Sequence, residues 1–200
     1  MTLQLLDKTT LETVPGTCLT LYGVSWEQFE AIDAVLADFP ELRLTYLDGI
    51  LDIMSPLSDE HEDSKRTLNL LLEAYLRFIS MRFYARGSRT LGSKALKAQE
   101  ETDDSYNLET KKNIPDLILE VVVTSSGVSK LEIYRRIGVP EVWFWRKEQL
   151  YLYHLRPDGY EAIAQSELLP ELDIPLLVHH ANMEDQYDAV QALTKAISKN

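Results

Sequence analysis

A single carboxylate interrupts the most apolar run of this chain. Residues 116–123 read DLILEVVV, and a run so rich in aliphatic and β-branched side chains predicts a strand that is covered on both faces. Glu120 lies in the middle of this run. A buried carboxylate loses its hydration unless a cation, a metal ion or a set of hydrogen bonds replaces the water. The fold must therefore bring such a partner to Glu120.

The residues after this strand predict a helix and a second strand. Ser126 or Ser129 can cap a helix over 130–137, and Gly138 provides the left-handed residue that ends it. Residues 139–145 then predict another strand. A strand, a helix and a strand of these lengths form a βαβ crossover, which should be right-handed.

One lysine of this helix lies at the edge of its apolar side. Lys130 shares a face with Ile133, Tyr134 and Ile137, because residues three, four and seven apart lie together on a helix. Its ammonium can therefore reach back over the strand that carries Glu120. The alternative is a surface lysine whose methylene stem covers the apolar stripe. For Tyr134, packing against the sheet is a simpler interpretation than a catalytic phenol.

The rest of the chain predicts further helices and strands in an order typical of an α/β fold of three layers. His179 and His180 are expected on a strand, where they would point to opposite faces and form a poor metal pair. The other expected elements are a helix at 26–36, strands at 43–46 and 50–54 joined by Asp48-Gly49, a helix at 58–82, strands at 83–90, 102–108, 150–155 and 160–164, and a C-terminal helix from Ala181.

Length and composition favour one compact domain. The chain has 200 residues, of which 45% are apolar, and we expect a single domain over 1–200 with 1–18 and 181–200 as peripheral extensions. No apolar run reaches the about 18 residues of a membrane span, so no membrane partner is expected. The single cysteine, Cys18, excludes an internal disulfide and fits a reducing, cytoplasmic location.

The net charge of −12 argues against a general affinity for nucleic acid, because such affinity depends on cationic contacts with phosphate. The charge is unevenly distributed, however, since residues 74–99 contain no acidic side chain. This segment predicts either a basic surface on an acidic body or a solvated helix face followed by a polar strand. Its cations are Arg77, Arg82, Arg86, Arg89, Lys94 and Lys97, with Lys65 and Arg66 upstream.

Three segments together resemble a known family: YLDGILDIMSP, PDLILEV and KLEIYRRIGVPEVWFW. They are similar to the Uma2 family (DUF820), which is abundant in cyanobacteria and belongs to the PD-(D/E)XK, restriction-endonuclease-like superfamily. The resemblance covers about residues 19–177. It implies a central mixed β-sheet with a βαβ core flanked by helices, a Mg²⁺ or Mn²⁺ cofactor, and nucleic acid, DNA rather than RNA, as the partner.

Spacing limits which carboxylates can share a metal ion. Asp116 and Glu120 lie four residues apart on one strand, roughly 13 Å, which is too far for one Mg²⁺. A hairpin between 102–108 and the central strand instead brings Asp103 beside Glu120. The resemblance agrees, because EETDDSY stands where the family has E-P-D-E-S-Y. Asp116 then becomes a residue that fixes the loop or supports the ligands, and Asp104 is the candidate if Asp103 faces away.

The lysine of the family's E-x-K signature is missing, since Val122 stands two residues after Glu120. The resemblance implies that Lys130 replaces it, with Asp103 and Glu120 as metal ligands. Glu60 and His61 can line the same site, although helix capping and the helix dipole explain acidic residues there equally well. The resemblance therefore implies a Mg²⁺-dependent endonuclease. The alternative is a non-catalytic module that serves as a binding or oligomerisation scaffold.

An oligomer is also expected. Trp143 and Trp145 share one strand face, where they form either core or subunit contacts. Together with the strand at 150–155, they give more apolar surface than a small domain easily covers, which predicts a homodimer.

Overall fold

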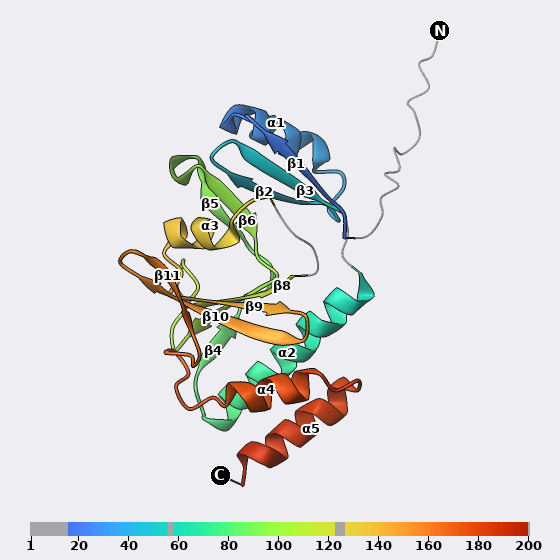
Figure 1. Ribbon diagram of the computed structural model, residues 1–200, viewed down its shortest axis with the longest axis vertical. Helices are drawn as coiled ribbons and strands as arrows, with labels where there is room; N and C mark the ends of the chain where they lie inside the picture. Colours follow the sequence, from blue (N-terminus) through green and yellow to red (C-terminus); the bar gives the residue numbers. More distant parts are fainter. Residues whose placement is uncertain (1–15, 56–57, 123–126, 200) are drawn as a thin grey trace.

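Two β-sheets and five α-helices form the part of the chain that the computed structural model describes, residues 16–55, 58–122 and 127–199 (Figure 1). None of the helices in these ranges is both long and apolar enough to cross a membrane. The fold is α/β, as the sequence predicts, and it is consistent with a restriction-endonuclease-like architecture.

The larger sheet contains the predicted βαβ unit. Its strand order is β11-β10-β9-β8-β7-β4, and β8 and β9 are parallel while the other neighbours are antiparallel. Helix α3 connects β8 to β9. The elements are β4 (Phe83–Ala85), β7 (Asp104–Leu108), β8 (Leu117–Val121), α3 (Lys130–Ile137), β9 (Glu141–Arg146), β10 (Gln149–Arg156) and β11 (Gly159–Ile163).

The smaller sheet is antiparallel, with strand order β1-β3-β2-β6-β5, and α1 packs against it (Figure 1). The Asp48-Gly49 turn joins β2 to β3 as predicted, with Leu47 paired to Ile50. Its elements are β1 (Cys18–Tyr22), α1 (Trp26–Leu36), β2 (Arg43–Leu47), β3 (Ile50–Met54), β5 (Thr90–Ser93), a 3₁₀ turn (Lys94–Leu96) and β6 (Ala98–Glu101).

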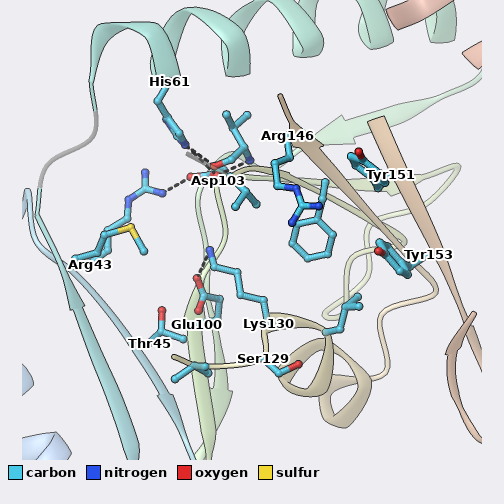
Figure 2. A pocket seen from close by; sticks show the side chains of 16 residues that line it. Arg43, Thr45, His61, Glu100, Asp103, Ser129, Lys130, Arg146, Tyr151 and Tyr153 are labelled. Carbon is cyan, nitrogen blue, oxygen red and sulfur yellow. Dashed lines mark hydrogen bonds and ion pairs between the residues drawn. The ribbon is translucent and has the colours of Figure 1, made fainter. Parts of the chain in front are cut away.

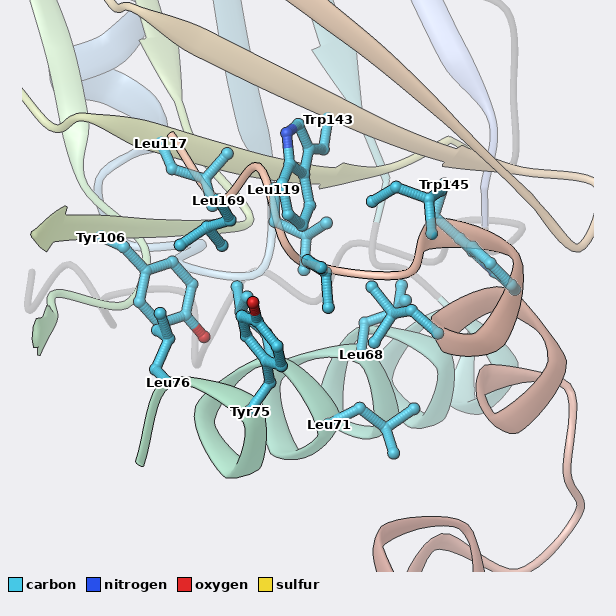
Figure 3. Close-up of a cluster of buried hydrophobic side chains, with 14 of the residues drawn as sticks. Leu68, Leu71, Tyr75, Leu76, Tyr106, Leu117, Leu119, Trp143, Trp145 and Leu169 are labelled. Carbon is cyan, nitrogen blue, oxygen red and sulfur yellow. The ribbon is translucent and has the colours of Figure 1, made fainter. Parts of the chain in front are cut away.

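Helices α2 (Asp59–Phe78), α4 (Ile174–Ala181) and α5 (Gln186–Ile197) cover one face of the larger sheet (Figure 1). Trp143 and Trp145 lie in this core, 1% and 6% exposed, which confirms the core interpretation of the pair. Figure 3 shows both tryptophans in the same cluster as Leu68, Leu71 and Leu76 of α2. Side chains alternate along a strand, so Ile118 and Glu120 of β8 face the opposite side, toward α3.

Three expectations about elements are wrong. The expected strand at 83–90 is divided between the sheets as β4 and β5, because Gly87 turns the chain in a left-handed conformation between them (φ 62°). The helix expected at 58–82 ends at Phe78, and Ser80 follows with φ 56°.

The region around the two histidines also differs from the expectation. His179 and His180 lie on helix α4, not on a strand, and α4 precedes the C-terminal helix α5. Asp173 caps α4 by accepting a hydrogen bond from the Leu176 N–H, and the proline in the first turn favours this helix start.

Candidate functional site

Glu120 contacts both residues that the sequence predicts beside it, Asp103 and Lys130. In the β7–β8 ladder Asp104 pairs with Leu119, which places Asp103, the residue before β7, opposite Glu120. The Asp103 N–H donates to Glu120 Oε1 at 3.3 Å. From α3, Lys130 Nζ lies 2.6 Å from Glu120 Oε2. The structure therefore brings Asp103, Glu120 and Lys130 together from three different elements.

Two further groups contact this centre. The Tyr134 hydroxyl donates to Glu120 Oε1 at 2.5 Å, so the phenol that packs against the sheet also orients the carboxylate. Lys130 Nζ also lies 2.8 Å from Oε1 of Glu100, on β6 of the smaller sheet. One ammonium thus joins two buried carboxylates that come from different sheets.

Asp103 is held by three other donors. Its Oδ2 accepts a hydrogen bond from the Val121 N–H at 2.8 Å and lies 3.3 Å from His61 Nε2. Its Oδ1 forms an ion pair with Arg43 of β2. Because its Nε2 contacts Asp103, the buried His61 lines the site from the start of α2, as one of the two sequence-based interpretations expects. Both sheets and α2 contribute to the orientation of this one carboxylate.

Burial and neighbouring charges shift the pKa values of the three acids in different directions. Burial raises the pKa of Glu120 to about 7; Lys130 opposes this shift, while Asp103 and Glu100 add to it. Burial likewise raises the pKa of Glu100. For Asp103, burial is outweighed by the hydrogen bond with His61 and the charges of Lys130 and Arg43, which hold its pKa below the usual range.

Lys130 stays charged despite its burial. Desolvation alone would lower the pKa of its ammonium, but Glu100, Glu120 and Asp103 raise it above its ordinary value. The site therefore combines a permanent cation with one firmly ionised carboxylate, Asp103, and with one that can exchange a proton near neutral pH, Glu120.

Asp103, Lys130, Glu100, Arg43 and His61 border a pocket of about 390 Å³, whereas Glu120 is fully buried and is not among the residues that line it (Figure 2). Its charged lining includes Arg43, Glu100, Asp103, Lys130 and Arg146. The volume falls in the range of about 300–1,000 Å³ that is usual for ligand sites. A ligand in this pocket would reach Lys130 and Asp103 directly.

The remaining expected site residues lie elsewhere. Asp116 accepts from the Leu108 N–H at 2.8 Å and from Lys112 Nζ at 2.6 Å, so it fixes the loop between β7 and β8. Asp104 accepts hydrogen bonds from Asn69 of α2 at its Oδ2 and from its neighbour's backbone N–H at its Oδ1, and does not line the pocket. Glu60 belongs to α2, but its side chain lies outside the described part of the structure.

The sequence reasoning missed Glu100 and Arg43. The sequence of β6, AQEE, has no apolar alternation that would mark Glu100, and the burial of Ala98 and Glu100 at alternate positions is evident only in the structure. No local signal marks Arg43, which enters the site only because β2 pairs with β6.

Comparison with protein families decides the affiliation of the chain, since residues 26–184 match Uma2, described as "Putative restriction endonuclease". The chain belongs to the Uma2 family. No curated protein matches it. Membership in Uma2 supports a nuclease-like function with nucleic acid as the substrate, and restriction-endonuclease-like proteins generally use divalent metal ions.

The donor set is compatible with a hard divalent ion in this Uma2 protein. Within the described ranges no three acidic, histidine or cysteine side chains form a ready-made metal cluster. Mg²⁺, however, usually takes one or two carboxylates and keeps several waters. Glu100 Oε2 is buried and has no hydrogen-bond partner among the described residues, so one acceptor of this carboxylate is still available to a cation.

Proposed function

We propose that this Uma2 protein is a Mg²⁺-dependent or Mn²⁺-dependent endonuclease that hydrolyses phosphodiester bonds of nucleic acid. The observation that carries the proposal is the position of Lys130. Its ammonium lies 2.6 Å from Glu120 and 2.8 Å from Glu100, and Asp103 lines the same pocket as Lys130. A fixed cation beside carboxylates in a pocket suits the binding of a metal ion and a phosphate together.

In this proposal Asp103 and Glu120 would hold the ion, together with the unpartnered Oε2 of Glu100. A bound divalent ion supplies Lewis-acid polarisation of the phosphate and lowers the pKa of a coordinated water. Lys130 stabilises the negative charge that develops on the phosphate oxygens, because its charge is permanent. Tyr134 fixes the rotamer of Glu120, while His61 and the Val121 N–H fix Asp103.

The finer expectations remain part of the proposal. We favour DNA over RNA, a cytoplasmic location, and a single domain over 1–200. A homodimer is also proposed, although Trp143 and Trp145, which suggested it, are covered by helices of the same chain. Light scattering at micromolar concentrations measures the oligomeric state, and a strictly monomeric mass would contradict the dimer.

One observation favours a second candidate function, a non-catalytic binding or oligomerisation scaffold. Lys130 and Arg43 already neutralise much of the acidic cluster, as they would in a site that binds no ion. Under this alternative Glu120 is a buried carboxylate that destabilises the fold when it is ionised. Only the nuclease candidate predicts that Mg²⁺ stabilises the protein.

The deciding experiment compares wild type, Glu120→Gln and Asp116→Asn in melting curves with and without MgCl₂ or MnCl₂. Asp116→Asn is the matched control, because Asp116 is also a buried carboxylate paired with a lysine, but it fixes the β7–β8 loop and does not contact Lys130 or Asp103. We expect metal to raise the melting temperature of wild type and of Asp116→Asn, but not of Glu120→Gln.

Cleavage assays on single-stranded and double-stranded DNA and RNA complete the test. Activity should require the metal and be lost in Glu120→Gln. Absence of both cleavage and metal-dependent stabilisation in the wild type would refute the nuclease and leave the scaffold.

A further inference from the structure

The pocket has an aromatic wall that the proposed chemistry does not use. Phe144 of β9 and Tyr151 and Tyr153 of β10 line it. In Figure 2 the two tyrosines lie opposite Arg43, with Arg146 between them and Asp103. Register explains the arrangement, since Tyr151 pairs with Phe144 and Tyr153 pairs with Val142. Alternation along β9 sends the two tryptophans into the core and leaves Phe144 and Arg146 on the pocket side.

The wall combines aromatic rings with Arg146, a cation that forms no ion pair with a carboxylate among the described residues. Tyr151 is 41% exposed, and the Arg146 guanidinium lies over its ring at 5.3 Å from the centroid. The Phe144 and Tyr153 rings meet edge to face at 5.8 Å. Within the described ranges Arg146 has no carboxylate partner, whereas Arg43 and Lys130 are both paired with acids.

We propose that Phe144, Tyr151, Tyr153 and Arg146 form a subsite for an unpaired nucleotide, so that the substrate is single-stranded or locally unpaired nucleic acid. This inference rests on the proposed nuclease function. Aromatic side chains and arginine planes bind bases by stacking on their faces, with little dependence on sequence. Arg146 also supplies a free charge for the phosphate next to the stacked base.

Two observations favour an unpaired nucleotide over a duplex. The rings line a pocket of about 390 Å³ that also contains Lys130 and Asp103, and a base inside a duplex offers no free face to such a wall. The body of the protein carries a net charge of −12, which opposes the many phosphate contacts that duplex binding requires. Stacking of one or two bases needs fewer cations.

The test measures binding without cleavage, in EDTA, with oligonucleotides that carry one 2-aminopurine, whose fluorescence falls when it stacks. The probes are single-stranded DNA, single-stranded RNA and a blunt DNA duplex of the same sequence. We expect tighter binding and stronger quenching for the single strands than for the duplex. Tyr151→Ala should weaken single-strand binding at least about tenfold and remove most of the quenching.

Two variants control this result. Tyr151→Phe keeps the ring and should bind as the wild type does. Tyr187→Ala removes a tyrosine that is 72% exposed and does not line this pocket, and it should change nothing. Because Tyr151 lies partly in solvent, its replacement should leave the fold intact, which a melting curve verifies.

Equal affinity for duplex and single strand, or unchanged binding by Tyr151→Ala, would overturn the subsite. So would a dimer that Tyr151→Ala dissociates without any effect on nucleic acid, since the wall would then be a contact between two copies of the chain. The two proposals fail separately. A wild type that stacks single strands but cleaves nothing defeats only the nuclease, and one that cleaves duplexes regardless of Tyr151 defeats only the subsite.

Discussion

The Lys130 ammonium lies 2.8 Å from the Glu100 carboxylate, although Lys130 belongs to the βαβ unit of one sheet and Glu100 to a strand of the other. This ion pair joins the two sheets at the pocket. It also places a second negative charge beside the lysine, in addition to Glu120 at 2.6 Å. The lysine consequently keeps its proton in a buried position, where desolvation alone would favour the neutral amine.

Replacing Lys130 tests this arrangement. In the nuclease proposal Lys130→Ala should retain metal binding, because an ammonium is not a ligand, while single-turnover cleavage falls about 100-fold. Lys112→Ala is the matched control, since Lys112 also pairs with a buried carboxylate, Asp116, but at the β7–β8 loop. A Mg²⁺ titration and a cleavage time course measure the two effects. Equal turnover in Lys130→Ala and wild type would exclude a catalytic role for the lysine.

The parts of the site that the sequence predicts are those with a local signature. Glu120 is evident because a charged residue interrupts an apolar strand, and Lys130 because helical spacing puts it over that strand. Asp103 follows from a short hairpin. Glu100 and Arg43 arrive from the smaller sheet, whose position depends on packing between distant segments. Such long-range packing leaves no periodic pattern from which a contact can be read.

The same difference between local signatures and long-range packing explains the errors in the predicted elements. The aliphatic run before His179 fits either a strand or a buried helix. The Asp173 cap and the packing of Leu177 into the core together favour the helix α4. The packing of Leu177 depends on the tertiary structure, so the sequence alone does not reveal it. The pocket wall shows both cases: strand alternation predicts that Phe144 faces away from Trp143, but not that it lines the same pocket as Asp103.

Stability should depend on pH in an unusual direction. Burial raises the pKa of Glu120 from 4.5 to about 7, so the folded state keeps a proton that the unfolded chain has lost between these values. The stabilisation is complete below pH 4.5 and is lost as the pH rises through about 7, on the order of 3 kcal/mol. We expect metal-free protein to melt higher at pH 5.5 than at pH 8. Glu120→Gln should flatten this dependence, as calorimetry can show.

The control for this prediction is to repeat the melting curves at both pH values with a divalent ion present. A metal ion competes with the proton for the ionised carboxylate, so MgCl₂ should stabilise the wild type more at pH 8 than at pH 5.5. A melting temperature that rises from pH 5.5 to pH 8 without metal in wild type and Glu120→Gln alike would contradict the raised pKa of Glu120.

Removing the Tyr134 hydroxyl should separate orientation from packing. Tyr134→Phe keeps the buried ring but deletes the donor that lies 2.5 Å from Glu120 Oε1. We expect a loss of about 1–3 kcal/mol in the free energy of unfolding, because the buried Glu120 oxygen loses its shorter hydrogen bond and keeps only the 3.3 Å one from the Asp103 N–H. Tyr160→Phe is the matched control, since that hydroxyl donates to the Val139 carbonyl instead of a site carboxylate. Only Tyr134→Phe should also weaken metal binding, which the Mg²⁺ titration measures.

The start of α3 is positioned by a close approach at Gly127. Asp52 of β3 accepts hydrogen bonds from the Val128 N–H at 3.1 Å and from the Thr20 hydroxyl at 2.5 Å. A Cβ on Gly127 would lie 2.7 Å from Thr20 Cγ2 and 3.2 Å from Asp52 Oδ1. Gly127→Ala should therefore push the loop away from β1 and β3 and displace Lys130, three residues later. We expect cleavage to fall at least about tenfold, with Mg²⁺ binding largely retained.

A double variant distinguishes this steric cause from general destabilisation. Thr20→Ala removes the atoms closest to the new Cβ, so Gly127→Ala combined with Thr20→Ala should recover part of the activity that Gly127→Ala loses. Thr20→Ala alone should cost little turnover, because Asp52 keeps its hydrogen bond from Val128. Losses that simply add in the double variant would show that Gly127 and Thr20 act independently, and the close approach would then not be what positions Lys130.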